Sequence, residues 1–254
     1  MRELKYLRGK SALLTVMVQA DNPDRVEQLI DLAAPMGAEA FGMQFCRMKP
    51  EYRSEDTYRR LFAKAGGLPV YVTNYRQGYN EGKSDDELAR GLLTLAECGA
   101  DLVDLTADLF DKSEGEFSTD HAAVEKQMRL IDAIHGRGAE VVMSSHVLKF
   151  LPAERVFEIA REVERRGADM CKIVLWSADV SEQLEILRIA DMLKNVISIP
   201  YLVLSGGEST LVRRVGCAAG SCTYLCVYEH DELSTKSQPT LAEAKAVRDL
   251  ILRT

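Results

Sequence analysis

The chain has 254 residues, of which 46% are hydrophobic and 28% charged, a composition typical of globular proteins. Its 32 basic and 39 acidic residues give a formal net charge of -7, which argues against a nucleic-acid-binding protein, because those normally carry a basic surface. No apolar run approaches the ~20 residues that span a bilayer, and the first residues lack a signal peptide's apolar centre. We therefore expect a cytoplasmic protein without a membrane partner.

Short apolar runs alternate with longer amphipathic ones along the chain, which indicates strands alternating with helices. Strands are expected at 12–18, 40–45, 69–75, 101–105, 140–144, 170–176, 197–204 and 221–228. Helices are expected near 24–36, 54–66, 84–98, 119–137, 153–166, 179–194, 209–217 and 240–252. Ser84 with Glu87, and Thr240 with Glu243, have the spacing of capping boxes at two of these helix starts.

Eight strand–helix units predict an α/β fold, a single (β/α)8 barrel that spans residues 1–254 without a linker. An open doubly wound sheet needs similar units, but it usually has a glycine-rich turn after its first strand, and residues 19–23 contain no glycine. In a barrel, the active site lies at the carboxyl ends of the strands. The polar residues expected there are Gln19, Gln44, Arg47, Asn74, Arg76, Thr106, Asp108, Ser145, His146, Lys172, Ser205, Ser234 and Gln238.

Lys172 is the one charged residue in the apolar run 170–176. With a period of two it shares a face with Met170 and Val174, so it either points into the barrel or reaches its edge. Burial of an amine disfavours its charged form, and this lowered pKa helps it to attack a ketone and form a Schiff base. A lysine paired with a neighbouring carboxylate is an equally good interpretation of the strand taken alone.

His146 ends the fifth expected strand and should therefore stand on the barrel rim beside the strand of Lys172. The chain has four histidines, and the other three, at 121, 135 and 230, do not end a strand. The ordinary pKa of histidine, ~6.5, suits a proton shuttle. A lysine and a histidine on adjacent strand ends predict imine formation with proton transfer beside it.

The six cysteines include no Cys-x-x-Cys pair, and four of them lie in apolar runs. In a reducing compartment such thiols behave as small core residues. The carboxylates nearest the expected barrel mouth, Glu81, Asp104 and Asp108, are not spaced with histidines as a ligand set. We therefore expect neither a disulfide framework nor a metal site.

From about residue 12 to the end, the chain resembles the type I 3-dehydroquinate dehydratase family. The sequence Ser-Ser-His at 144–146, followed by Pro152, resembles the family's S-x-H…T-P segment, and Gly-Ala-Asp-Met-Cys-Lys at 167–172 resembles its G-A-D-x-x-K segment. Arg213 has the spacing of the family's carboxylate-binding arginine, and Ser234 and Gln238 match the serine and glutamine of its closing lid. Each motif is weak alone, but all of them occur in the family's order.

The resemblance implies that Lys172 forms an imine with a ring ketone, while His146 removes the adjacent proton and then protonates the departing hydroxyl. The implied reaction is that of a hydro-lyase of the shikimate pathway, which converts 3-dehydroquinate into 3-dehydroshikimate without a metal or organic cofactor. Arg213, Ser234 and Gln238 would bind this small carboxylate substrate. The resemblance also implies a homodimer.

The chain departs from the family pattern after its second and third strands. The family's Glu-x-Arg reads Gln-Phe-Cys-Arg at 44–47, so neutral Gln44 and a displaced Arg47 are expected at the substrate. Arg76 is matched to the arginine after the third strand. Glu81 is the candidate acidic partner of the catalytic histidine, with Asn80 as the alternative because of a one-residue offset. Loss of a charged partner near the ring hydroxyls could retune the substrate.

Two other functions fit the same barrel. Gly206 and Gly207 open a short helix after the seventh strand, a common phosphate site in barrels, and with Lys172 they would suit an imine-forming aldolase acting on a sugar phosphate. The same glycines also fit a simple tight turn. A non-catalytic, metabolite-binding barrel is the remaining alternative, since Gln44 replaces a charged residue.

Overall fold

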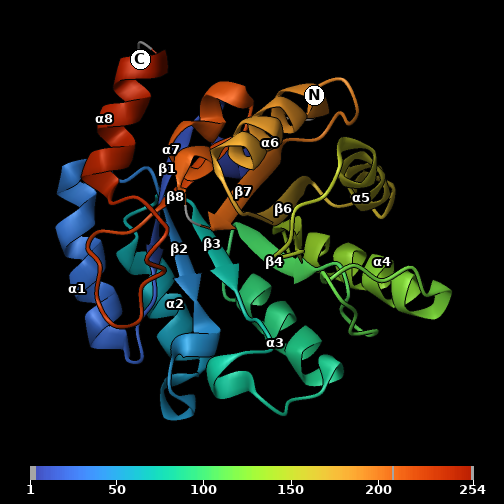
Figure 1. The fold of residues 1–254 in the computed structure, drawn as a ribbon. Helices are drawn as coiled ribbons and strands as arrows, with labels where there is room; N and C mark the ends of the chain where they lie inside the picture. The colour runs from blue at the N-terminus through green and yellow to red at the C-terminus, as the bar shows by residue number, and fades with distance from the viewer. Residues whose placement is uncertain (1–3, 208, 253–254) are drawn as a thin grey trace.

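The computed structural model describes residues 4–207 and 209–252, and its strands form one parallel sheet in the order β7-β6-β5-β4-β3-β2-β1-β8. Each strand from β1 to β6 pairs with the next one along the chain, and β1 also pairs with β8. Figure 1 shows the strands surrounded by helices. The strands are β1 (Leu13–Val18), β2 (Ala40–Gln44), β3 (Val70–Thr73), β4 (Leu102–Thr106), β5 (Glu140–His146), β6 (Met170–Ser177), β7 (Tyr201–Gly207) and β8 (Thr223–Cys226).

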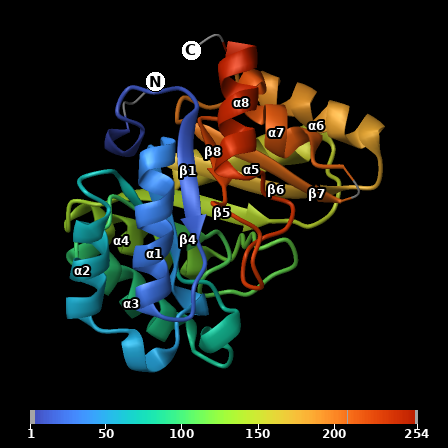
Figure 2. The same cartoon turned by 90° about the vertical axis from the view of Figure 1, so that its left-hand side faces the viewer.

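The connections between successive strands, and the segment after β8, contain the helices that cover the outside of the sheet. Figure 2 shows α8 and α1 on the side of β1, and both pack against that strand. The two capping boxes expected from the sequence, at Ser84 and Thr240, are present. The helices are α1 (Pro23–Ala33), α2 (Glu55–Lys64), α3 (Asp85–Glu97), α4 (His121–His135), α5 (Ala153–Arg165), α6 (Val180–Leu193), α7 (Leu211–Val215) and α8 (Leu241–Leu252).

The two end strands of the sheet, β7 and β8, approach one another and nearly close the ring. The backbone N–H of Cys222 donates to the carbonyl of Tyr201 at 2.9 Å, and the N–H of Val203 donates to Ser221 Oγ at 3.1 Å. Parallel strands linked by helices and brought round in this way form a (β/α)8 barrel. The predicted fold class is confirmed.

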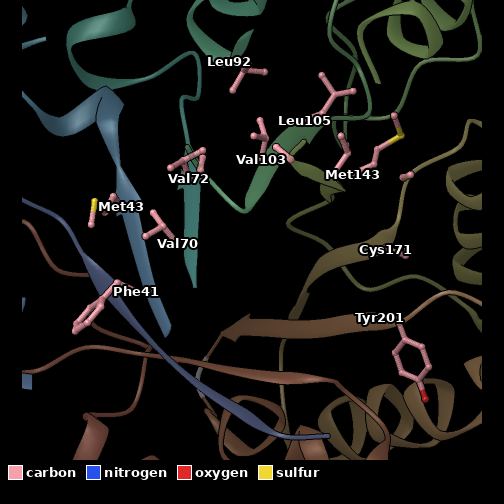
Figure 3. Close-up of a cluster of buried hydrophobic side chains, with 14 of the residues drawn as sticks. Phe41, Met43, Val70, Val72, Leu92, Val103, Leu105, Met143, Cys171 and Tyr201 are labelled. Carbon is pink, nitrogen blue, oxygen red and sulfur yellow. The ribbon is translucent and has the colours of Figure 1, made fainter. Parts of the chain in front are cut away.

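Two layers of apolar side chains follow from the alternation of side-chain direction along each strand. On β1, Leu14 and Val16 belong to a cluster between the barrel and its helices, whereas Leu13 and Met17 belong to a cluster inside the barrel. Figure 3 shows part of the outer cluster, with side chains from β2 to β7 and Leu92 from α3. The helix-covered barrel therefore excludes water from both sides of its strands.

The amino end of the barrel is covered by a short 3-10 helix, Lys5–Leu7, that we did not anticipate from the sequence. Its backbone N–H groups at Lys5 and Tyr6 donate to the carboxylate of Glu140 at 2.8 and 3.0 Å, and the ring of Tyr6 lies in the inner cluster. Water is thereby kept from the amino end, so the ligand-accessible opening lies at the carboxyl end.

The expected strands and helices all occur, and the main difference lies in the seventh strand. Residues 197–200 are irregular, and β7 begins only at Tyr201 and continues to Gly207. Pro200 has no backbone N–H to donate to a sheet ladder, so the strand starts after it. No helix within the described ranges combines the length and apolar character needed to cross a bilayer.

Candidate active site

Lys172 lies on β6 with 5% of its surface exposed and points into the barrel. Its Nζ atom is 3.0 Å from Oδ2 of Asp104 and donates to the hydroxyls of Tyr75 at 2.8 Å and Tyr71 at 3.1 Å. The amine is therefore buried inside the barrel and paired with a neighbouring carboxylate, which was the second of the two interpretations of this strand. The pair gives the site a nitrogen that is shielded from bulk water and held by three oxygen atoms.

Asp104 is the buried carboxylate at the centre of this cluster. Its Oδ2 accepts hydrogen bonds from both tyrosine hydroxyls, and Oδ1 accepts one from Ser144 Oγ. Burial by itself would raise the pKa of the Asp104 carboxyl, but the charge of Lys172 and the surrounding hydroxyl donors hold that pKa below its usual value. Asp104 is thus an anion 3.0 Å from the Lys172 nitrogen, and it can stabilise a positive charge that develops at that position.

His146 stands at the carboxyl end of β5, on the strand beside Lys172, where the sequence analysis placed it. Its Nδ1 lies 2.5 Å from Oε2 of Glu116, and its ring meets the ring of Tyr75 edge-on with 5.2 Å between centroids. The Glu116 contact orients the imidazole so that Nε2 is the nitrogen left for a ligand. A histidine oriented by a carboxylate is the arrangement that a general base requires.

The acidic partner of the histidine was expected to be Glu81 or Asn80, and the geometry places a different residue there. Glu81 is exposed. Asn80 is buried, but its side chain accepts from Arg53 at 2.6 Å and donates to Asn74 and to the carbonyl of Tyr75, so it fixes the loop after β3. The carboxylate at His146 comes instead from the loop after β4.

A cavity of about 250 Å³ opens at the carboxyl end of the strands and brings most of the candidate residues together. Lys172 and His146 both line it, so the amine and the imidazole face one ligand space. Apolar side chains close part of the wall, which lowers the local dielectric and strengthens polar interactions with a ligand. The lining residues are Met17, Gln19, Gln44, Arg47, Tyr71, Thr73, Tyr75, Gln77, His146, Leu148, Lys172, Val174, Leu204, Arg213, Leu225, Thr235 and Gln238.

Arg213, on α7, supplies positive charge to this cavity. Its Nε donates to the carbonyl of Ser205 at 2.9 Å. Within the described ranges, no carboxylate forms an ion pair with it, and burial lowers its pKa to about 10. A half-buried guanidinium without an anionic partner favours a bound carboxylate or other anion, because bidentate hydrogen bonds to such a group recover the lost solvation.

Three buried polar atoms of the cavity wall have no hydrogen-bond partner among the residues described: Nε of Arg47, Oγ1 of Thr73 and Oε1 of Gln238. Gln44, by contrast, accepts from Nε2 of Gln19 at 2.6 Å and donates to Sγ of Cys46. Buried polar groups in folded proteins nearly always find a partner, so these three atoms are candidate contacts for a ligand. At Gln44 the wall offers neutral donors and acceptors, where the family's Glu-x-Arg pattern has a glutamate.

Two candidate binding residues lie outside the cavity. Arg76 binds Asp85 at 2.7 Å and Asp108 at 2.6 Å on the rim next to His146, and these carboxylates outweigh its burial and raise its pKa. Ser234 closes a turn of its own loop, where its hydroxyl donates to the carbonyl of Asp231. Both polar groups are already satisfied, so the assignment of these two residues to the substrate is not supported by the geometry.

The loop that carries Ser234 nevertheless closes over the site through its neighbours. Between β8 and α8 this segment, red in Figure 2, folds back so that the N–H of Thr235 donates to Oε1 of Gln19 at 2.8 Å. Gln238, at the other end of the same turn, is buried in the cavity wall. Thr235 and Gln238 are therefore the loop residues that face a ligand.

Comparisons with known proteins agree with this geometry. The family model for type I 3-dehydroquinase matches residues 16–253. The chain belongs to the type I 3-dehydroquinase family. A 3-dehydroquinate dehydratase of Methanosarcina mazei is 26% identical over 206 residues, which cover 78% of each chain. Membership of the type I 3-dehydroquinase family confirms the predicted enzyme class, a hydro-lyase.

Solved structures of 3-dehydroquinate dehydratases have the same fold. The protein from Geobacillus kaustophilus superimposes with a TM-score of 0.80 at 17% identity, over 95% of this chain and 91% of that one. The Clostridium difficile protein, solved with covalently modified comenic acid, gives a TM-score of 0.80 at 16% identity, over 96% and 94%. At this level of identity the likeness establishes the barrel and leaves the site to be argued from its residues.

Four residues of the candidate site were not assigned to it from the sequence: Tyr71, Tyr75, Asp104 and Glu116. Tyr71 and Tyr75 read as ordinary strand residues, and Asp104 as a strand carboxylate bonded to a loop. The period of two did contain a signal, because Asp104 alternates with apolar residues in the same way as Lys172. No pattern pointed to Glu116, since a long loop carries it from β4 across to β5.

The glycines considered as a phosphate site in this type I 3-dehydroquinase are explained by packing. A Cβ atom on Gly206 would lie 2.9 Å from the ring of Trp176. Gly207 has a φ of +114° and runs against the carbonyl of Ser177, where a side chain would clash. Both glycines end β7, where they pair with Trp176 and Ser177 of β6, so close packing between these strands accounts for them and the expected turn at this position is wrong. The helix α7 is a single short turn.

Proposed function

We propose that this protein removes water from 3-dehydroquinate to give 3-dehydroshikimate through an imine on Lys172. The observation that carries the proposal is that the buried amine of Lys172, the oriented imidazole of His146 and the unpaired guanidinium of Arg213 line one cavity. Family membership supports the reaction, and the placement of these three groups supports the roles.

The chemistry begins with attack of Lys172 Nζ on the ring ketone, with loss of one water, to leave a protonated imine. Asp104, 3.0 Å from Nζ, would balance its positive charge. An adjacent protonated imine acidifies the neighbouring C–H bond, because the electron pair released can delocalise onto nitrogen. His146 would accept that proton and then return a proton to the hydroxyl that leaves from the next carbon. Hydrolysis of the imine then releases the conjugated ketone and regenerates the amine.

Binding of the ring would use the charged and unpaired groups of the cavity wall. The substrate carboxylate is assigned to Arg213, whose charge has no protein anion to neutralise it in the described part of the chain. Ring hydroxyls are assigned to Gln238, Thr73 and Arg47, whose buried polar atoms have no hydrogen-bond partner within residues 4–207 and 209–252. The Gln19–Gln44 amide pair replaces a charged contact, so this site should bind neutral hydroxyls through weaker hydrogen bonds than an ionic site would.

The proposal is tested by incubating purified protein with 3-dehydroquinate, following the ultraviolet absorbance of the conjugated product and trapping the imine with borohydride. We expect turnover and a reduced adduct on Lys172 by mass spectrometry. Lys172→Ala should abolish both, whereas Lys149→Ala, an exposed lysine paired with Glu114, should change neither. His146→Ala should retain the adduct and lose about 10²- to 10⁴-fold in rate.

The same experiment separates the alternatives. A non-catalytic barrel would bind the compound and yield no adduct. An imine-forming aldolase would yield an adduct with a sugar phosphate and none with 3-dehydroquinate. Either result contradicts the proposed reaction.

A further inference from the structure

Tyr75 touches the reacting nitrogen and lies where a substrate carbonyl would enter. Its hydroxyl accepts from Lys172 Nζ at 2.8 Å and donates to Asp104 Oδ2 at 2.5 Å. The residue lines the cavity together with His146, and its ring packs edge-on against that imidazole. Nothing in the proposed roles of the other residues uses this hydroxyl, although it is the one phenol at the cavity mouth that contacts Nζ among the residues described.

Tyr71 makes the same two contacts from a deeper position. Its side chain is 3% exposed, and it also lines a small void inside the barrel together with Tyr6 and Leu102. Tyr71 lies within β3, whereas Tyr75 follows the end of β3 and is only partly buried. The two phenols therefore hold Nζ from opposite levels of the barrel, with Tyr75 nearer to the opening.

Imine formation requires two protons to move from nitrogen to oxygen. The resting ammonium carries three protons and the ketone oxygen none, while the protonated imine retains one and the released water carries two. Both protons come from Lys172, so the step balances without an outside acid, but a group must carry them across. His146 stands on the neighbouring strand for the C–H and hydroxyl steps, and its Nδ1 is occupied by Glu116.

We propose that Tyr75 is a catalytic residue that relays protons between Lys172 Nζ and the substrate oxygen during imine formation and hydrolysis. This inference rests on the proposed imine mechanism. In each transfer the phenol turns its hydrogen bond from Asp104 Oδ2 to the substrate oxygen, gives that oxygen its own proton and accepts one from nitrogen. It therefore begins and ends neutral. Asp104 stays in place as the hydrogen-bond partner and counter-charge of the nitrogen.

The surroundings keep this phenol protonated between transfers. Burial and the nearby charge of Asp104 both raise the pKa of Tyr75 well above its ordinary value. A hydroxyl that stays neutral can donate to a developing alkoxide, and the relay avoids a free phenolate. The same environment would make a permanent proton loss from Tyr75 unfavourable.

The test measures the rate of imine formation apart from turnover, by mixing protein with 3-dehydroquinate and quenching with borohydride after increasing times. Tyr75→Phe should slow the appearance of the Lys172 adduct by about 10²-fold or more. A relay changes a rate and not an equilibrium, so the final extent of adduct should equal that of the wild type. Tyr79→Phe, an exposed tyrosine on the same loop, is the matched control and should leave the rate unchanged.

Three outcomes overturn the relay. The first is a Tyr75→Phe rate within threefold of the wild type, and the second is an equal loss in Tyr71→Phe, which would indicate a general disturbance of the Lys172 cluster. The third is loss of imine formation in His146→Ala with Tyr75→Phe unaffected. If the wild type itself forms no adduct, the proposed function fails as well, and that result is distinct from the other three.

A second probe covers the case in which Tyr75→Phe does not fold. Fluorotyrosine at position 75 keeps the shape of the ring and lowers the pKa of its hydroxyl. The rate of imine formation and its pH profile should both shift in this protein. An unchanged rate and profile would overturn the relay.

Discussion

The charge of Arg213 should destabilise the free protein, because no carboxylate of the described residues forms an ion pair with it in the cavity. Burial lowers its pKa to about 10, and at ~1.4 kcal/mol per pH unit this corresponds to roughly 3 kcal/mol of unfavourable solvation for the charged form. The side chain is only half-buried, and solvent in the cavity reduces that figure to about 2 kcal/mol. Arg213→Met keeps most of the aliphatic packing and loses one hydrogen bond to the Ser205 carbonyl, worth about 1 kcal/mol.

We therefore expect Arg213→Met to raise the free energy of unfolding in urea by about 1 kcal/mol. The same change should raise the KM for 3-dehydroquinate about 30- to 150-fold, since losing a charge-assisted pair with the substrate costs about 2–3 kcal/mol. Arg214→Met is the matched control, because that neighbouring arginine is more exposed and lies 4.0 Å from Glu243. It should change neither the stability nor the KM appreciably.

Thermal unfolding with and without product gives an independent readout of the same charge. 3-Dehydroshikimate at 100 times its wild-type Kd should stabilise the wild type by about 2.7 kcal/mol and Arg213→Met, at the same concentration, by only about 0.3–0.9 kcal/mol. A variant that is less stable than the wild type by more than 1 kcal/mol would refute the reasoning. It would mean that Arg213 is a structural cation and not one reserved for a ligand.

Three further predictions concern groups that support the site. Glu116→Gln should lower kcat at least tenfold by loosening the imidazole of His146, while Glu81→Gln should leave kcat within twofold in the same steady-state assay. The pKa of Asp104 is lowered in the folded state, so its contribution to stability is present above the unfolded pKa of about 4 and is lost as the pH falls through the folded value. In urea titrations at different pH, the free energy of unfolding of Asp104→Asn should therefore fall less steeply toward acid pH than that of the wild type. Parallel curves would contradict this prediction. Arg166→Met should lower the free energy of unfolding by about 2–5 kcal/mol, because Arg166 donates to the carbonyls of residues 107 and 118. Amide hydrogen exchange in the loop that carries Glu116 should also become faster. Exchange as slow as in the wild type would show that Arg166 does not hold this loop in place.

Much of the fold could be predicted from the sequence, because the periodicity of apolar residues indicates which side chains are buried. Each strand has apolar residues on both faces, since helices cover the outside and side chains fill the inside. The seventh strand shows where this reasoning fails. Ile197 and Ile199 are apolar enough to read as strand, but they are buried in an irregular segment ahead of Pro200. Hydropathy reports the burial of these residues and not their backbone hydrogen bonding.

In the candidate site, the reacting residues on strands could be predicted from the sequence, whereas the loop residue that holds His146 could not. Lys172 and His146 were predictable because both lie on strands, where the register fixes which face and which neighbour a side chain has: Ser144 of β5 pairs with Lys172 of β6. Glu116 was not predictable, because its position depends on a loop whose path is set by contacts far away in sequence. Arg166, 1% exposed, anchors that loop from α5.

Because strands carry Lys172 and His146 and loops carry some of their partners, the lysine–histidine pair can be kept while the residues around it change. The strand register of the barrel holds Nζ and the imidazole on adjacent strands whichever residues surround them. A carboxylate for the histidine can then come from either loop that reaches the rim of β5, and in this protein it comes from the loop after β4. The rim of β3, which was expected to supply that carboxylate and a substrate arginine, instead presents the hydroxyl of Tyr75 to Lys172 and ties Arg76 to two carboxylates. Since the strands carry Lys172 and His146 and the loops carry some of their partners, we expect a change of loop residue to alter substrate binding more than the placement of these two side chains.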